Sequence, residues 1–499
     1  MDCNKLFENF ENIDEPLECE RIGASPPAWL TGQLLRNGPG KFKYGDTEVK
    51  HWFDGMAYMQ RFQLKDGKLF YSAKFLESEA YKMCEQANRL CVSSFGTVRF
   101  PDPCKGLYGR FQSMFIKEDG WDNCVVNFVQ LSDAVYALTE TPKVVKIDPD
   151  TLGTKAGEDL QKVLSINSCT AHPQTDLAGN VYNSGHLFGK QYVFTETKGD
   201  KSDFSETILY ASVPYEDRWN PAYHHSFGMS PNYIVLFETP LRISLMKLMA
   251  RNILSYSFKD TLHWKEGTNT NVIVVDRKTG SRHTIRYTAP PFFTFHHANT
   301  YEEDGFIYVD FCHMENPGTF DDLLMDHMRD GSFTKNPKMR PYLHRMVLPI
   351  KIPTAAEPGS DLATSAPHGR GAKAILQPDG SIYCESARIC EHSFEFPRFN
   401  WDANNMKPYQ FVYGSTLLFD EEKENLAGIV KVDLHTGATL LWHRDNEFQL
   451  CVLLVPVMTL KEDQAPVFVV LNAKNLQEIC RYTIPTDRLP PAFHSLYLS

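Results

Sequence analysis

Short apolar runs bounded by turn residues recur along most of the chain. Clear examples are Asn232 to Pro240, Asn271 to Val275, Gly305 to Phe311 and Val467 to Leu471. Runs of this length that are rich in β-branched and aromatic residues are typical of strands. Helical periodicity is rarer, and its best case, Leu241 to Leu254, predicts an amphipathic helix packed outside the sheets. The pattern predicts a mostly β protein.

A degenerate unit recurs in which an apolar strand ends in Asp or Asn and a short turn follows. It is seen at Asp148, Asp276, Asp433 and Asn472, where the side chain can accept hydrogen bonds from backbone N–H groups two residues on. The separations of 128, 157 and 39 residues exclude a simple tandem array. The unit fits a β-propeller with blades of unequal length, and it equally fits ordinary hairpins of a large β protein. Glycine and proline are spread evenly, so we expect one domain over residues 1–499.

Charge and composition exclude several classes of function. The chain has 499 residues, 51 Lys and Arg against 62 Asp and Glu, and a net charge of −11, which argues against a nucleic-acid partner. Its longest nearly apolar run, Leu450 to Leu460, is shorter than the ~20 residues that span a bilayer. The acidic N-terminus does not resemble a targeting signal, and the twelve cysteines show no CxxC spacing. We therefore expect reduced thiols and a cytoplasmic location.

Histidines offer the main candidate chemistry. Two adjacent pairs, His224-His225 and His296-His297, stand among 17 histidines. Imidazole is a frequent ligand of iron, copper and zinc, but a histidine beside phenylalanine is also a common hydrogen-bonded core residue. There is no HExxH, GxSxG, P-loop or GxGxxG motif. The candidate ligands are dispersed, so any metal site must be assembled by the tertiary fold.

Several longer segments of the chain are distinctive. They are LTGQLLRNGPGKF (30–42), HWFDGMAYM (51–59), FGTVRFPDPCK (95–105), YALTET (136–141), CTAHP (169–173), HHSFGMSPNYIV (224–235), FHHANTYEEDG (295–305), FEFPRFNW (394–401) and FHSLY (493–497). These segments cover almost the whole chain in order. They resemble the carotenoid oxygenase family, and in particular its animal branch of β-carotene oxygenases and the retinoid isomerohydrolase.

This resemblance implies a seven-bladed β-propeller with a helical and loop cap over an axial iron site. It further implies one Fe(2+) per chain, held by His172, His225, His296 and His494. Separations of 53, 71 and 198 residues are compatible with one site if the inner strands of separate blades converge. His224 and His297 would then point away, because alternate strand residues face opposite sides.

The resemblance also implies glutamates that accept a hydrogen bond from the second ring nitrogen of three of these histidines. Glu140 and Glu395 match two of them. The third has no counterpart, since the chain passes from Trp442 directly towards the next strand and roughly 16 residues are missing by the repeat logic. We expect a shortened blade near residues 447–452 and a loss of the partner of His494, for which Glu447 is a candidate substitute.

By this resemblance the chain is an iron(II) dioxygenase that cleaves a conjugated double bond of a β-carotene-like carotenoid with O2 to apocarotenal or retinal products. No side chain acts as a catalytic group beyond the metal centre, and Phe95, Thr139 and Tyr223 match positions of the substrate tunnel. Two alternatives stay open: a retinyl ester isomerohydrolase, and a carotenoid- or retinoid-binding protein of impaired activity, which the missing segment motivates.

A water-insoluble polyene must come from a membrane. Residues 101–117 place Leu107, Phe111 and Met114 or Phe115 at helical spacing with basic residues between them, which suits peripheral binding to a membrane surface. A buried amphipathic helix is the alternative. Cys104 matches a position that is acylated in the isomerohydrolase branch, although an unmodified thiol is the default.

Overall fold

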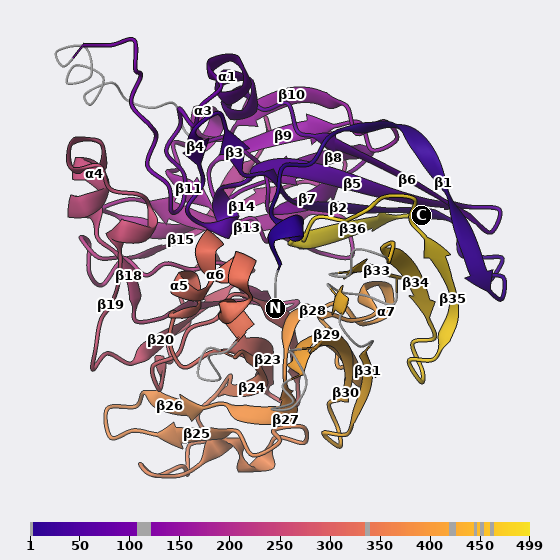
Figure 1. The fold of residues 1–499 in the computed structure, drawn as a ribbon. Helices are drawn as coiled ribbons and strands as arrows, with labels where there is room; N and C mark the ends of the chain where they lie inside the picture. Colours follow the sequence, from indigo (N-terminus) through magenta and orange to yellow (C-terminus); the bar gives the residue numbers. More distant parts are fainter. Residues whose placement is uncertain are drawn as a thin grey trace.

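Antiparallel sheets, arranged around a centre as in a propeller, form nearly all of the regular structure (Figure 1). The computed structural model describes residues 3–106, 121–334, 340–418, 426–443, 447–449, 454–459 and 464–499. Helices are few and short. The expectation of an all-β, propeller-like fold is confirmed.

Strands from both halves of the chain share the largest sheet. In order of pairing it contains β32 (Glu447–Gln449), β33 (Leu454–Thr459), β34 (Val467–Leu471), β35 (Glu478–Thr483), β1 (Ile13–Gly23), β6 (Lys68–Phe75), β5 (Met56–Lys65), β2 (Gly32–Lys41) and β36 (His494–Leu498). The first strands of the chain are therefore joined to the last ones twice, through the pairs β1 with β35 and β2 with β36.

The other sheets follow one another along the sequence. They are β10 (Thr154–Asp159), β9 (Lys143–Ile147), β8 (Ala134–Leu138) and β7 (Asn127–Leu131); β11 (Ser168–Cys169), β13 (Val181–Leu187), β14 (Gln191–Thr197) and β15 (Ile208–Pro214), with β12 (Gln174–Thr175) beside β13; β16 (Gly228–Met229), β17 (Tyr233–Glu238), β20 (Thr270–Asp276), β21 (Tyr287–Ala289), β26 (Ile382–Glu385) and β25 (Lys373–Leu376); β22 (His297–Glu303), β23 (Phe306–His313), β24 (Tyr342–Pro349) and β27 (Ala387–Ser393); and β28 (Glu395–Arg398), β29 (Phe411–Leu418), β30 (Leu426–Asp433) and β31 (Thr439–His443). Two further hairpins pair β3 (Lys43–Tyr44) with β4 (Thr47–Glu48) and β18 (Leu241–Ile243) with β19 (Leu262–Trp264).

The expected seven separate blades are not seen in the strand pairing. Six sheets of four or more strands are present in the described part of the chain. The difference arises at β1, which pairs with β35 on one side and with β6 on the other and so merges two groups of strands into one nine-stranded sheet.

The predicted strands and strand-to-turn units are confirmed. The four apolar runs form β17, β20, β23 and β34. At the ends of β9, β20 and β30, Asp148, Asp276 and Asp433 each accept from two backbone N–H groups that lie two and three residues on. Asn472 accepts from one such group, the N–H of Lys474. The carboxylate or amide thus starts each turn where the apolar run ends.

The predicted helix at residues 241–254 begins four residues later than expected. Leu241 and Ile243 are buried in β18, and Ser244 then caps α4 (Leu245–Leu254) by accepting from the N–H of Lys247. The first residues alternate with a period of two, which is a strand pattern that the helical spacing of the later leucines obscures.

Several of the short helices contact one another. These helices are α4, α5 (Thr319–Asp322), α6 (Met325–Asp330), η1 (Asn4–Leu6), η3 (Lys259–Thr261) and η4 (Ser332–Thr334), where η denotes a 3-10 helix. A further 3-10 helix is η2 (Trp52–Asp54). Figure 1 shows α5 and α6 close to the N-terminus, near the middle of the view. The remaining described helices are α1 (Glu79–Ala87), α3 (Gln161–Leu164), α7 (Trp401–Asn404) and η6 (Leu362–Ser365). No described helix has the length and apolar character needed to cross a membrane.

Candidate metal centre and cavity

The structure brings the four predicted ligand histidines together. Each of His172, His225, His296 and His494 offers one ring nitrogen, and these four atoms lie within 4.8 Å of one another. All four side chains are buried. This is the grouping that a first-row metal ion requires, assembled from residues that are far apart in the sequence.

Each histidine lies at or close to the end of a strand, and the four strands belong to different sheets. His172 lies between β11 and β12, His225 precedes β16, His296 precedes β22, and His494 is the first residue of β36. Their direct neighbours point elsewhere. The Nε2 of His224 lies 2.9 Å from Ser184 Oγ, and the Nδ1 of His297 lies 2.8 Å from Ser226 Oγ. His224 and His297 therefore point away from the group of four, as predicted, although His224 and His225 lie outside any described strand.

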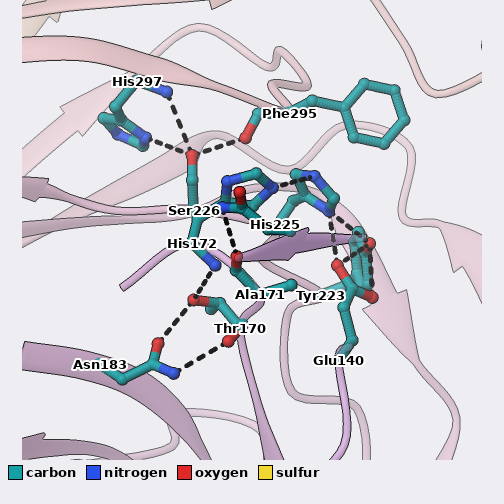
Figure 2. A network of polar contacts seen from close by, with 11 residues as sticks. Glu140, Thr170, Ala171, His172, Asn183, Tyr223, His225, Ser226, Phe295 and His297 are labelled. Atoms are coloured by element: carbon teal, nitrogen blue, oxygen red, sulfur yellow. Dashed lines mark hydrogen bonds and ion pairs between the residues drawn. The ribbon is translucent and has the colours of Figure 1, made fainter. Parts of the chain in front are cut away.

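Glu140 orients His225. Its Oε1 lies 2.5 Å from His225 Nδ1, and the hydroxyl of Tyr223 donates to the same carboxylate at 2.8 and 2.9 Å. Figure 2 shows His225 between this carboxylate and His172, whose Nε2 lies 2.8 Å from His225 Nε2. Because the Nδ1–H donates to Glu140, the Nε2 of His225 keeps its lone pair for a metal.

Glu395 does the same for His296. The first residue of β28, Glu395 accepts from His296 Nδ1 through Oε2 at 2.5 Å. The opposite ring nitrogen, His296 Nε2, is buried and has no hydrogen-bond partner among the described residues. An unpartnered buried imidazole nitrogen is costly in a folded protein, and a metal ion would satisfy it.

His494 differs from these two. Among the residues whose side chains the structure describes, no carboxylate forms a hydrogen bond or ion pair with its ring. The backbone of Glu447 lies in β32, which pairs with β33, but its side chain is outside the described residues, as are residues 450–453. The proposed role of Glu447 therefore stays a prediction.

Burial lowers the pKa of three of these imidazoles and so favours their neutral form. It lowers the pKa of His172 and of His494 well below the usual value, and the neighbouring imidazoles lower both further. Burial also lowers the pKa of His296, although the charge of Glu395 opposes that shift. Neutral imidazoles with free lone pairs are the form that binds a metal, so the donor set fits a divalent ion such as iron(II).

An apolar cavity of about 500 Å³ adjoins the histidines, within the range typical of small-molecule sites. The predicted tunnel residues Phe95, Thr139 and Tyr223 all line it. Aromatic rings dominate its wall, and they include Trp52, Phe53, Phe258, Phe295 and Phe493. The cavity can therefore hold a long apolar molecule beside the metal site.

Two polar contacts of the site were not foreseen from the sequence. Tyr223 lines the cavity as expected, but its hydroxyl also fixes Glu140. Ser226 Oγ donates to the carbonyl of Phe295 at 2.5 Å, which ties the segment of His225 to that of His296 (Figure 2). The position of Ser226 directly after His225 was the only available signal, and it does not reveal a partner 69 residues away.

The predicted membrane segment is largely outside the described residues, which stop at residue 106 and resume at residue 121. Cys104 is described and exposed. A second apolar surface was missed. On α4, the side chains of Met246, Met249, Ile253 and Leu254 are more than half exposed. The same helix contributes Leu248 and Arg251 to the cavity wall, so the helix lies between this surface and the cavity.

Comparisons with known proteins agree with this arrangement. The family described as "Retinal pigment epithelial membrane protein" matches residues 6–499. The carotenoid-cleaving dioxygenase, mitochondrial, of Homo sapiens is 33% identical over 96% of this chain and 88% of its own length. Beta,beta-carotene 15,15'-dioxygenase of Homo sapiens is 31% identical over 97% and 92%.

Solved structures show the same fold. Cobalt-substituted Synechocystis ACO matches with a TM-score of 0.76 and 19% identity over 98% of this chain and 97% of that one. An ACO/RPE65 chimera matches with a TM-score of 0.75 and 20% identity over 99% and 97%. With the family match over nearly the whole length, the chain belongs to the retinal pigment epithelial membrane protein family, which is the family of the animal carotenoid oxygenases.

Proposed function

We propose that this protein is a non-haem iron(II) dioxygenase that cleaves a conjugated double bond of a β-carotene-like carotenoid with O2 and releases apocarotenal or retinal products. The observation that carries the proposal is the group of four buried histidines at the wall of an apolar, aromatic cavity. The names of the relatives, which are carotenoid-cleaving dioxygenases, support it.

In this proposal, His172, His225, His296 and His494 hold one Fe(2+) per chain. Bound iron supplies the redox chemistry with O2 that none of the side chains can provide. Four neutral imidazoles add no charge to the ion. The negative charge beside the site is that of Glu140 and Glu395, which contact His225 and His296 rather than the ion.

The chain's own residues bind, orient and exclude water. The aromatic wall offers the polyene an apolar surface and keeps water from the reacting double bond. Glu140 and Glu395 fix the direction of His225 and His296 by holding the proton on each Nδ1. No side chain has to act as a general base, because the reaction needs no proton transfer from the substrate.

The test combines metal analysis with product analysis. Purified protein is loaded with iron(II) and incubated with β-carotene under 18O2. The products are separated, and their masses are measured by mass spectrometry. We expect aldehydes that carry label, and His296→Ala should lose both iron and products. The matched control is His297→Ala, whose ring points to Ser226. Products with no label, or iron retained by the His296→Ala variant, would contradict the proposal.

A second candidate function follows from His494. Because the described part of the chain shows no carboxylate on this histidine, a carotenoid- or retinoid-binding protein of impaired activity is the runner-up. It predicts polyene binding with substoichiometric iron and no turnover. A retinyl ester isomerohydrolase would instead release retinol from retinyl ester without consuming O2, and the same assay with that ester distinguishes it.

We also propose that the protein binds a membrane surface peripherally, from the cytoplasmic side, and takes its substrate there. The exposed apolar side chains of α4 support this, since Lys247 on the same helix is exposed and can face anionic lipid. Cys104 is exposed and could carry an acyl chain, which alone would give only marginal binding.

Vesicle sedimentation tests the membrane proposal. With vesicles of phosphatidylcholine and phosphatidylserine, the double variant Met249→Asp, Ile253→Asp should lose most of its binding. The control is Ile208→Asp, which changes an equally exposed apolar residue on β15. Equal binding by the two variants would contradict a role of α4.

The finer fold assignment is likewise a proposal. If the nine-stranded sheet counts as two blades, β32 to β35 and β1, β6, β5, β2 and β36, the propeller has seven blades in a single domain over residues 1–499. The shortness of β32 and its antiparallel pairing with β33 support a shortened blade near residues 447–452.

A further inference from the structure

The N-terminal segment forms part of the cavity wall. Cys3, Leu6 and Phe7 line the cavity together with Met328 and Phe333, and all five pack in one apolar cluster. Leu248 and Phe258, which also line the cavity, belong to a different cluster and therefore to another part of the wall. The side chains of Cys3, Leu6 and Phe7 are at most 2% exposed, so this wall is closed towards solvent.

Hydrogen bonds hold the N-terminal segment firmly in this place. The N–H of Cys3 donates to the carbonyl of Arg329 at 2.8 Å, next to the end of α6. The guanidinium of Arg488 donates to the carbonyls of Lys5 at 3.0 Å and Asn9 at 2.8 Å. The guanidinium of Arg329 also donates to the carbonyl of Phe7 at 3.4 Å. Because both guanidinium groups bind backbone carbonyls, they hold the segment whichever side chains it carries.

A continuous series of rings connects this wall to the metal site. Ring centroids are 5.0 Å apart between His225 and Phe295, and 6.4 Å apart between Phe295 and Phe53. The series continues from Phe53 to Trp52 at 6.3 Å and from Trp52 to Phe7 at 6.5 Å. Packed aromatic rings are close to incompressible, so the distance from the histidines to Phe7 is fixed.

We propose that residues 3–7 are the end wall of the substrate cavity and determine which double bond of the polyene lies at the histidines. A conjugated polyene is rod-like, so it stops where its leading ring meets Leu6 and Phe7. The double bond that lies beside the metal site is then determined by the length of the cavity between Leu6 and Phe7 and the four histidines. This inference rests on the proposed function only for the identity of the reaction, since the depth limit acts on binding itself.

Binding of ligands of two lengths tests the wall without turnover. Wild type and Leu6→Trp are loaded anaerobically with β-carotene or with the shorter retinal, and bound polyene is measured by its absorbance after gel filtration. We expect Leu6→Trp to weaken β-carotene binding at least 10-fold and retinal binding less than 2-fold. The control Leu30→Trp enlarges a buried leucine outside the cavity and should change neither. An equal loss for both ligands, or no loss, would overturn the proposal.

Product analysis tests the same wall by enlarging it. Phe7→Ala should let the polyene enter further and raise the share of a second pair of aldehydes at least 5-fold. The control is Phe75→Ala, which also removes a buried ring with two aromatic neighbours but does not line the cavity. An unchanged product ratio in Phe7→Ala, or an equal change in Phe75→Ala, would overturn the proposal. If wild type gives no aldehydes, the proposed function fails and the binding comparison still decides the role of the wall.

Discussion

Removing the two orienting glutamates should weaken iron binding unequally. In Glu395→Ala, His296 Nδ1 loses its carboxylate partner. In Glu140→Ala, His225 Nδ1 still has the hydroxyl of Tyr223 at 3.2 Å, which can accept in place of the carboxylate. The structure therefore predicts a larger loss at Glu395 than at Glu140.

The magnitudes follow from the hydrogen-bond acceptors that remain for His225 Nδ1 and His296 Nδ1 in each variant. A hydrogen bond to a charged group contributes about 1.5–3 kcal/mol, and 1.4 kcal/mol corresponds to a factor of ten in a dissociation constant. A complete loss at His296 thus predicts iron binding that is weaker by about 100-fold, the upper limit for an outer-sphere partner. Partial replacement by Tyr223 leaves a loss of about 10-fold for Glu140→Ala.

The assay is anaerobic competition of each variant with a colorimetric iron(II) chelator. Adding Tyr223→Phe to Glu140→Ala should bring the loss to about 100-fold, because the replacement acceptor is then gone. Glu196→Ala, which removes a Tyr182–Glu196 hydrogen bond away from the histidines, should bind iron like wild type. Equal losses for Glu140→Ala and Glu395→Ala, or unaltered affinity in both, would refute the reasoning.

Three further predictions concern stability and the support of the site. Burial lowers the pKa of His344 to about 3, so below pH 6.5 the unfolded chain binds a proton at this residue and the folded protein does not. The free energy of unfolding of the wild type should therefore fall as the pH falls. Between pH 7 and 5, measured by urea unfolding, His344→Gln should lose about 2 kcal/mol less than wild type. Asp310 and Arg345 form a fully buried ion pair at 2.7 Å, and Arg345→Met should cost about 3–5 kcal/mol in the free energy of unfolding, whereas a cost below 1 kcal/mol would contradict this. A Cβ on Gly38 would lie 2.6 Å from the Cα of Ala492, two residues before His494, so Gly38→Ala should reduce iron affinity while Gly157→Ala, where the nearest atom is 4.0 Å away, should not.

The four candidate ligand histidines were accessible to sequence reasoning only through whole motifs. Spacing alone could not distinguish His172 or His494 from other buried histidines, because the four residues come from four sheets and meet only in the folded chain. Alternation along an extended chain predicts only that the two histidines of a pair point in opposite directions. The family resemblance, not the local pattern, selected His225 over His224 and His296 over His297.

Features that depend on three-dimensional packing were missed. The start of α4 was placed four residues early because two periodicities overlap at Leu241 to Leu245. The bond between Tyr223 and Glu140 joins residues 83 positions apart, and no local pattern encodes it. The merging of two groups of strands into one sheet depends on β1 pairing with β35, a contact between opposite ends of the sequence.

The pairing of β36 with β2 gives the metal a mechanical role. His494 reaches the other three imidazoles only when β36 lies against β2, so the fourth bond to the ion can form only after the two ends of the chain have joined. A ligand that binds only the joined form stabilises it in proportion to its affinity. Bound iron would thus stabilise the contact between the two ends of the chain. Removal of iron should therefore destabilise the pairing of β2 with β36 before any other part of the molecule.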